Sequence, residues 1–149
     1  TVTGVQTCAL PISKRSFLTD SLHLILHTMS NVTSVLSLLK MFESFDVPGF
    51  LACLTDDAVY RFGNYPPAAG KEAIAATIKA SHMDQITGIS FDIKSTYEQG
   101  DAVVVELAVN YNMVSGKTIT LPCLDIFRFS GDKVKAMLVF MDASPLFAG

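Results

Sequence analysis

Hydrophobic positions recur with the period of a helix early in the chain. Ser30 and Asn31 are favourable N-cap residues. Behind them, apolar residues stand three or four positions apart at Val32, Val35, Leu36, Leu39 and Phe42. This spacing predicts a first helix that ends at about Ser44.

The next segment mixes helical and extended patterns. Asp46 can cap a second, short helix. We expect a turn at 55–57 and a short strand at 58–62. The stretch 63–70 (GNYPPAAG) is predicted to be a loop, because two prolines and two glycines prevent regular structure there. Residues 71–82 have the apolar spacing of a third helix.

From about Gly88 onward the pattern changes to that of strands. β-Branched and aromatic residues are frequent, and Gly-Asp or Ser-Gly pairs mark turns at 100–101, 115–116 and 131–132. Four strands are predicted, at 88–98, 102–114, 117–129 and 133–142. Their short connections predict an antiparallel meander, and helices followed by strands indicate an α+β domain.

The first 28 residues do not belong to this pattern. Residues 2–12 (VTGVQTCALPI) resemble the translation of a sequencing-library adapter, which suggests a metagenomic origin. We therefore predict a non-native or disordered leader at 1–28, a natural start at Met29 and one domain at 29–149. Residues 17–28 are apolar, but Asp20 and two histidines interrupt them, so we do not interpret them as a signal peptide.

Composition narrows the classes of function. The chain has 149 residues, of which 50% are hydrophobic and 17% charged, as expected of a single soluble domain with a real core. A net charge of −3 offers no basic face for nucleic acid. No apolar run reaches the length of a membrane span. Three unpaired-looking cysteines predict neither a disulfide framework nor a metal site, and favour a cytoplasmic location.

Two segments carry a family resemblance. Residues 54–74 (LTDDAVYRFGNYPPAAGKEAI) and 124–147 (LDIFRFSGDKVKAMLVFMDASPLF) resemble the SnoaL-like branch of the nuclear transport factor 2-like superfamily. Ketosteroid isomerases, polyketide cyclases and limonene epoxide hydrolases are relatives. The resemblance implies a cystatin-like cone of order αα-β-α-ββββ, with a curved antiparallel sheet wrapped around the N-terminal helices. It also implies a small-molecule cavity, and a homodimer through the outer sheet face.

The isomerase resemblance transfers only in part. Asp125 falls where ketosteroid isomerases place the protonated aspartic acid of their oxyanion hole. Their base aspartate falls near Arg61 or Phe62, and their tyrosine donor falls near Met41, so neither group is matched.

The epoxide hydrolase resemblance is weaker still. The Arg-x-Asp pair of the epoxide hydrolases falls on Glu106 and Ala108, and the second aspartate of these enzymes falls on Val139. Only their tyrosine is matched, by Tyr60. Neither known mechanism therefore transfers whole.

The Ser115-Gly116 turn allows the register of the second hairpin, 102–114 with 117–129, to be predicted. A two-residue loop would pair residue 114 with 117, which places Glu106 directly opposite Asp125. Two carboxyl groups so close cannot both ionise easily, which gives an acid beside a base. Alternation alone gives the opposite interpretation, with 106, 108, 110 and 112 in solvent. A one-residue bulge would separate the two carboxyl groups.

Further candidates complete the predicted site. Tyr60 could donate a hydrogen bond into the cavity, although a tyrosine in such a strand is more often part of the core. His82 ends the third helix, where a structural role at the helix C-terminus outweighs catalysis. The remaining candidate ligand-binding residues are Phe62, Asn64, Asn110, Cys123, Phe127, Met137 and Val139.

Three functions remain open. The first is a cofactor-independent acid–base isomerase, cyclase or lyase acting on a small hydrophobic compound, with Asp125 as acid, Glu106 as base and Tyr60 as positioning donor. The second is a non-catalytic ligand-binding or dimerisation protein of the same fold. Epoxide hydrolysis is third. We expect no cofactor and no metal, because no phosphate-binding loop or ligand cluster is present in the sequence.

Overall fold

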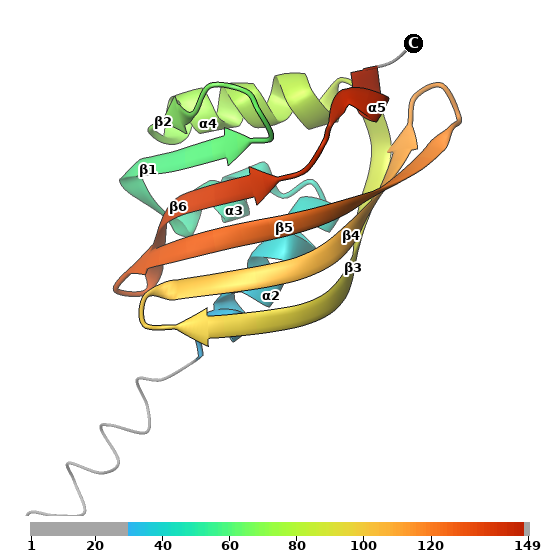
Figure 1. Ribbon diagram of the computed structural model, residues 1–149. Coiled ribbons are helices and arrows are strands. Elements are labelled where there is room, and N and C mark those ends of the chain that lie inside the picture. Colours follow the sequence, from blue (N-terminus) through green and yellow to red (C-terminus); the bar gives the residue numbers. More distant parts are fainter. Residues whose placement is uncertain (1–29, 148–149) are drawn as a thin grey trace, which may run out of the picture.

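The computed structural model describes residues 30–147. The helices are α2 (Asn31–Glu43), α3 (Val47–Ala52), α4 (Lys71–Ile78) with the π-helical turn η1 (Lys79–Met83), and α5 (Ser144–Phe147). The strands are β1 (Leu54–Phe62), β2 (Ala68–Ala69), β3 (Ile86–Gln99), β4 (Ala102–Met113), β5 (Thr118–Ser130) and β6 (Lys133–Phe140) (Figure 1). None of the helices within 30–147 is long and apolar enough to span a membrane. The predicted leader lies outside the described residues.

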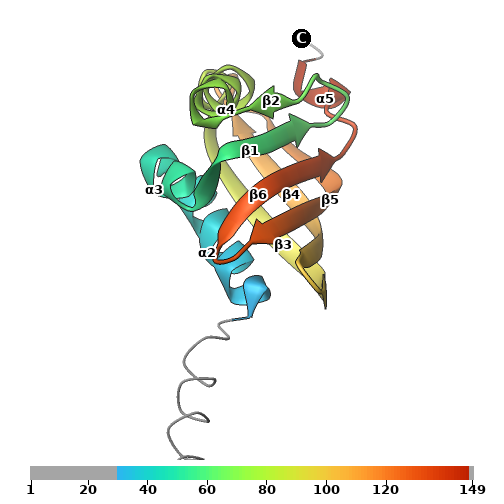
Figure 2. The ribbon, with the colours of Figure 1, turned by 90° about the vertical axis from the view of Figure 1, so that its left-hand side faces the viewer.

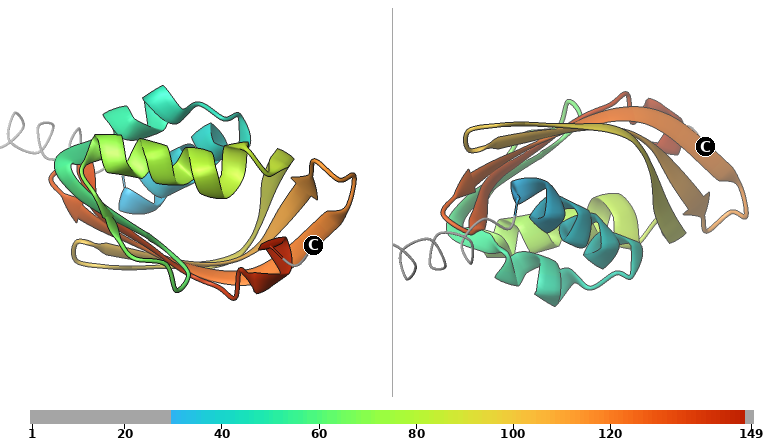
Figure 3. Two further views of the ribbon diagram at one scale, coloured as in Figure 1. Left: turned by 90° about the horizontal axis from the view of Figure 1, so that it is seen from above. Right: turned by 90° about the horizontal axis from the view of Figure 1, so that it is seen from below.

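The strands form one curved, open sheet in the order β2-β1-β6-β5-β4-β3. Strands β3 to β6 are an antiparallel meander, as predicted, whereas β1 runs parallel to β6. The sheet bends around α2, α3 and α4, which lie on its concave side (Figure 3). The α+β cone is thereby confirmed, with a sheet that is mixed rather than purely antiparallel.

Local differences from the predicted elements lie around β1. Strand β1 begins at Leu54 rather than at residue 58, because an irregularity between Leu54 and Val59 absorbs the polar residues 55–57 without ending the strand. Ala68 and Ala69 pair with β1 as the short strand β2. The predicted loop therefore contains one short strand.

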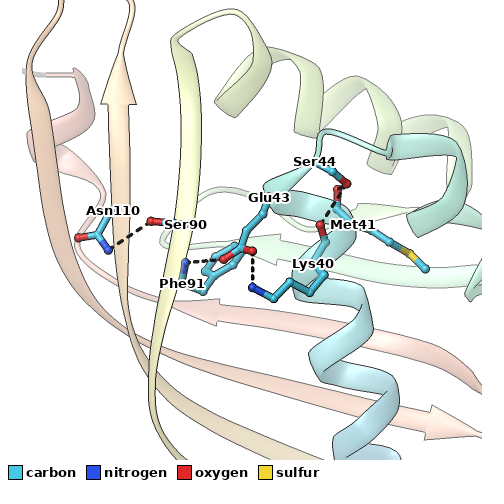
Figure 4. A network of polar contacts seen from close by, with 7 residues as sticks. All are labelled: Lys40, Met41, Glu43, Ser44, Ser90, Phe91 and Asn110. Carbon is cyan, nitrogen blue, oxygen red and sulfur yellow. Dashed lines mark hydrogen bonds and ion pairs between the residues drawn. The ribbon is translucent and has the colours of Figure 1, made fainter.

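Helix α2 lies across the concave face (Figure 2), and side-chain contacts join both of its ends to strand β3. At its start, the Glu98 carboxylate accepts hydrogen bonds from the Ser30 hydroxyl (2.6 Å) and the Asn31 amide (3.2 Å). At its end, Glu43 accepts from the Phe91 amide at 3.0 Å and pairs with Lys40 at 2.7 Å (Figure 4). Strand β3 is the sheet edge, so Glu43 also satisfies a backbone donor that no neighbouring strand reaches.

The core lies between the helices and the concave face of the sheet. Helix α2 presents Val35, Leu38 and Leu39 to it. The inward rows of β4 and β5 alternate strictly with outward residues. These inward rows are Val103, Val105, Leu107, Val109 and Tyr111 on β4, and Leu121, Cys123, Asp125, Phe127 and Phe129 on β5.

The loop between β4 and β5 sets the register of this hairpin. It holds three residues, 114–116, because Met113 donates to the Lys117 carbonyl at 2.8 Å. Gly116 donates to the Met113 carbonyl and has φ +85°, the arrangement of a tight turn followed by a left-handed residue. Asp125 consequently pairs with Val105, and Glu106 pairs with Leu124.

Candidate functional site

Asp125 is the only acidic side chain buried among residues 30–147, with an exposed fraction of 2%. It points from β5 into the concave side, where the Cys123 thiol donates to Oδ1 at 3.1 Å. No Lys, Arg or His of residues 30–147 lies within 4.0 Å of its oxygens. Burial raises the pKa of Asp125 from its usual 3.8 to about 7, and the Cys123 hydrogen bond opposes this only in part. The group can therefore act as a neutral donor near pH 6.

His82 reaches the same cavity from the end of α4. The side chain is buried, and it follows Ile74 and Ile78 at four-residue spacing on the inward face. It lies in the π-helical turn η1, a feature frequent at functional sites. Burial lowers the pKa of His82 from 6.5 to about 4, so the imidazole is neutral near pH 7.

The hydrogen bonds of Ser81 define which imidazole nitrogen is free. The single hydroxyl proton of Ser81 points to the Thr77 carbonyl at 2.7 Å. The Ser81 oxygen also lies 2.7 Å from Nδ1 of His82, so it must accept a proton from that nitrogen. We infer an Nδ1–H tautomer, which leaves Nε2 as an unprotonated base.

Two buried tyrosines complete the polar part of the site. Burial is the main cause that raises the pKa of Tyr60 well above its usual value, and the neighbouring Tyr111 and Asp125 add to it. Burial likewise raises the pKa of Tyr111, whose hydroxyl contacts the Met141 sulfur at 3.6 Å. Both phenols therefore stay protonated as donors. Tyr111 was not among the site residues predicted from the sequence, and its place in the inward row of β4 was the available signal.

These groups line a cavity that is almost full. Its volume is about 20 Å³, enough for roughly one water, whereas small-molecule sites usually need some hundreds of Å³. The expected open hollow is therefore absent from this structure, because aromatic side chains fill it. The apolar lining is Phe42, Phe62, Ile89, Phe91, Val109, Met137, Val139 and Met141.

Six of the predicted site residues line this cavity. They are Tyr60, Phe62, Cys123, Asp125, Met137 and Val139. Phe127 is fully buried on the same face but does not border the cavity.

The predicted pairing of Glu106 with Asp125 is wrong. The three-residue loop shifts β5 by one position, so Glu106 faces solvent on the convex side, opposite Leu124. Asn110 lies on that side too, where its side chain bonds Thr120 (2.7 Å) and contacts Ser90 at 3.5 Å (Figure 4). Alternation alone placed 106, 108, 110 and 112 in solvent: all four lie on the convex face, where 106 and 112 are exposed and 108 and 110 are half-buried.

Two other predicted features lie outside the cavity. Asn64 belongs to an exposed loop and borders a shallow surface hollow with Arg61 and Tyr65. The Arg61 guanidinium lies 4.8 Å from the Phe140 ring centroid on the convex face. Within residues 30–147, no three or more His, Cys, Asp or Glu side chains gather as metal ligands would.

No curated protein matches this chain. Among solved structures, a nuclear transport factor 2-like protein of unknown function from Burkholderia pseudomallei has 20% identity and a TM-score of 0.73, over 80% of this chain and 96% of that one.

Two further solved structures have the same fold. A candidate SnoaL-like polyketide cyclase from Jannaschia sp. CCS1 has 19% identity and a TM-score of 0.66, over 78% and 88%. An LEH-like epoxide hydrolase of M. tuberculosis has 18% identity and a TM-score of 0.65, over 77% and 84%. Identities this low establish the fold alone. The family described as the SnoaL-like domain matches residues 35–137, well over half of the sequence. The chain therefore belongs to the SnoaL-like domain family.

Proposed function

We propose that the protein is a cofactor-independent acid–base enzyme for a small, mostly apolar carbonyl compound. Asp125 is the neutral acid and His82 is the base. Asp125 replaces the predicted carboxylate pair as a single acid, and His82 takes the role that the sequence assigned to Glu106. We place the activity in the cytoplasm, where the free thiols of Cys53 and Cys123 stay reduced.

One observation carries this proposal: a carboxyl without a basic partner and a neutral imidazole border one apolar cavity. Burying such groups costs stability unless they are well hydrogen-bonded. Strongly shifted pKa values are frequent at functional sites, because catalytic acids and bases need pKa values matched to their task. The two shifts also run in opposite directions, which is the arrangement that separates an acid from a base.

The chemistry follows from the protonation states. Nε2 of His82 takes a proton from the carbon beside the substrate carbonyl, and the C–H electron pair forms the C=C bond of an enolate. Asp125 and Tyr60 donate hydrogen bonds to the oxygen on which the negative charge develops. In a β,γ-unsaturated ketone the enolate is a conjugated dienolate, and the proton returns from His82 to the γ carbon, which moves the double bond into conjugation with the carbonyl. In a diketone the enolate carbon instead attacks the second carbonyl to close a ring, and the alkoxide formed takes the proton back from His82.

The solved relatives support an enzyme of this class without naming its substrate. One is described as a candidate polyketide cyclase, a type of enzyme for which ring closure through an enolate is plausible chemistry. An epoxide hydrolase is also among them, but its charged set does not fit here. Glu106 is exposed and Ala108 and Val139 are apolar, so epoxide hydrolysis is less well supported.

A proton-exchange screen in deuterated water tests the proposal. Small cyclic ketones and polyketide-like diketones are incubated with wild type, Asp125→Asn, His82→Phe and the surface control Glu106→Gln. We expect Asp125→Asn and His82→Phe to lose 10²–10⁴-fold in kcat/KM, and Glu106→Gln to stay within about 2-fold. The wild-type pH profile should be bell-shaped, with limbs near the pKa values of about 4 and about 7.

Equal rates in wild type and Asp125→Asn would remove Asp125 from the mechanism. A ligand that binds wild type without any proton exchange would support the alternative function, a non-catalytic binding protein. The observation that favours this alternative is the lack of the known catalytic sets: Arg61 and Phe62 stand where the isomerase base falls, and Ala108 and Val139 where the hydrolase aspartates fall.

We further propose that a second copy of the chain covers the convex sheet face. That face exposes Leu124 and Phe140, with Ile126 and Leu138 half-buried beside them. Contiguous apolar side chains of this kind mark interaction sites. Arg61 and Glu106 lie on the same face and could pair between copies across a two-fold axis.

Sedimentation of Leu124→Lys tests this. Wild type should be a dimer and Leu124→Lys a monomer, whereas Val114→Lys, an exposed apolar residue in the hairpin loop, should remain a dimer. A monomeric wild type at high micromolar concentration would contradict the proposal.

A further inference from the structure

A second apolar hollow lies beneath the bend between α2 and α3. We propose that it is the entrance to the Asp125 cavity and the subsite for the apolar body of the ligand. The ligand would then be an elongated compound with one polar end, which reaches Asp125, and an apolar end under the bend. This inference rests on the proposed function, because it assumes that the Asp125 cavity takes a ligand.

The two hollows adjoin each other. Phe42, His82 and Ile89 line both. The rings of Phe42 and His82 lie 6.1 Å apart, centroid to centroid, and Phe42 packs edge-on against Phe50 at 4.6 Å. A partition of two aromatic side chains therefore separates them, and rotation of Phe42 would join them.

The lining of the outer hollow determines the kind of ligand that fits. Apart from Asp46 and His82, all its residues are apolar: Met41, Phe42, Phe45, Val47, Phe50, Ile78, Ile86 and Ile89. Asp46 is already engaged, because it accepts from the Gly49 amide at 2.9 Å as the cap of α3. An apolar ligand body is stabilised here, and a charged one would lose hydration without a partner.

Opening is needed, because the outer hollow is only about 10 Å³ in volume. The bend above it is the strained part of the backbone: Phe45 has φ +57°, a conformation that bulky residues rarely adopt. The end of α2 is held by the contact of Glu43 with the Phe91 amide, one residue away from Phe42 (Figure 4). Breaking that hydrogen bond would free the turn that carries Phe42.

A competing entrance exists at the 63–70 loop. The surface hollow beside Asn64 and Tyr65 is much larger, about 500 Å³, but it shares only Met141 with the Asp125 cavity. Arg61, Asn64 and Tyr65 line it, so it suits a more polar ligand than the hollow under the bend does. The three shared side chains and the apolar lining favour the bend.

Binding kinetics of a neutral probe distinguish the two entrances. The probe is 6-propionyl-2-dimethylaminonaphthalene, an elongated aromatic ketone whose emission reports a dry environment, followed by stopped-flow fluorescence. Val47→Trp narrows the hollow under the bend, and Asn64→Trp is the matched control at the loop. We expect Val47→Trp to lower the association rate constant at least 10-fold and Asn64→Trp to change it less than 2-fold.

A second variant keeps the test decisive if Val47→Trp does not fold. Phe42→Ala removes the partition and should raise the association rate constant several-fold. Slowing by Asn64→Trp alone would overturn the inference in favour of the loop. No effect of Val47→Trp or Phe42→Ala, or no binding by wild type, would overturn it as well. Because binding is measured without turnover, a failure of the proposed catalysis would leave this result intact.

Discussion

The two faces of the sheet place the same chemical group, a carboxyl, in opposite environments. Asp125 and Glu106 lie on neighbouring strands of one hairpin, yet Asp125 is 2% exposed on the concave face and Glu106 is exposed on the convex face. Asp101, in the turn between β3 and β4, pairs with Arg128 and Lys135 of the convex face at 3.9 and 3.4 Å in solvent, where such pairs contribute little. Within residues 30–147 no cation pairs with the concave-face carboxyl, and burial raises the pKa of Asp125 to about 7, so this group is mostly protonated below that pH. The reactivity of a side chain here depends on its face.

Truncating one aromatic residue on each face should give the largest contrast. Phe127 is fully buried on the concave side, and Phe140 is 43% exposed on the convex side. We expect Phe127→Ala to lower the free energy of unfolding by about 3–5 kcal/mol, and Phe140→Ala by less than about 1 kcal/mol in the monomer. Urea unfolding at low protein concentration measures both. Equal losses would mean that the faces differ less in packing than their burial indicates.

The pH dependence of stability should separate the two carboxyl groups. The folded state binds the Asp125 proton more tightly than the unfolded chain does, so this group's contribution to stability falls as pH rises from about 4 to about 7. His82 acts in the opposite sense: its folded pKa is lowered to about 4, so its contribution rises with pH up to about 6.5. In wild type the two effects oppose each other.

Asp125→Asn should therefore leave only the histidine effect. As pH rises from 4 to 7, the free energy of unfolding of this variant should increase relative to that of wild type by on the order of 4 kcal/mol, the equivalent of roughly three pKa units. Glu106→Gln should follow the wild-type curve, because its carboxyl lies in solvent. Urea unfolding at a series of pH values is the measurement, and parallel curves for wild type and Asp125→Asn would refute a buried, protonated Asp125.

A smaller effect is expected where the helix layer meets the sheet edge. Glu43→Ala leaves the Phe91 amide without its acceptor, which should cost about 1–2 kcal/mol of unfolding free energy. Lys40→Ala removes only the exposed partner of Glu43 and should cost less than about 0.5 kcal/mol. Thermal unfolding and exchange of the Phe91 amide hydrogen measure the difference. Unchanged exchange in Glu43→Ala would contradict the role of this contact.

Features that depend on neighbouring residues were predictable from the sequence. Ser30 accepts from the Val32 amide and Asp46 from the Gly49 amide, so both predicted caps are confirmed. The strands of the meander also lie where alternation and turn residues placed them. These patterns are local, and the family resemblance supplied the arrangement of the elements in space.

Features that depend on geometry over longer distances were not predictable in the same way. The register of β4 and β5 follows from one additional loop residue, which the Ser115-Gly116 pair alone does not reveal. His82 joins the site because α4 packs over the sheet. The four-residue spacing of Ile74, Ile78 and His82 was the available signal for its burial. How completely the cavity is filled depends on side-chain packing, which sequence pattern does not define.

The length of the β4–β5 loop decides whether the odd-numbered or the even-numbered side chains of β5 face the helices, and hence whether an acid is buried there. With three residues in the loop, one parity of β5 side chains faces the helices, and Asp125 is among them. If the hairpin closed with a two-residue loop instead, pairing residue 114 with 117, the other set of β5 side chains would face the helices, with Ile126 and Leu124 in place of Asp125 and Cys123. A change in length far from the cavity could thus abolish or create its acid without any substitution inside it.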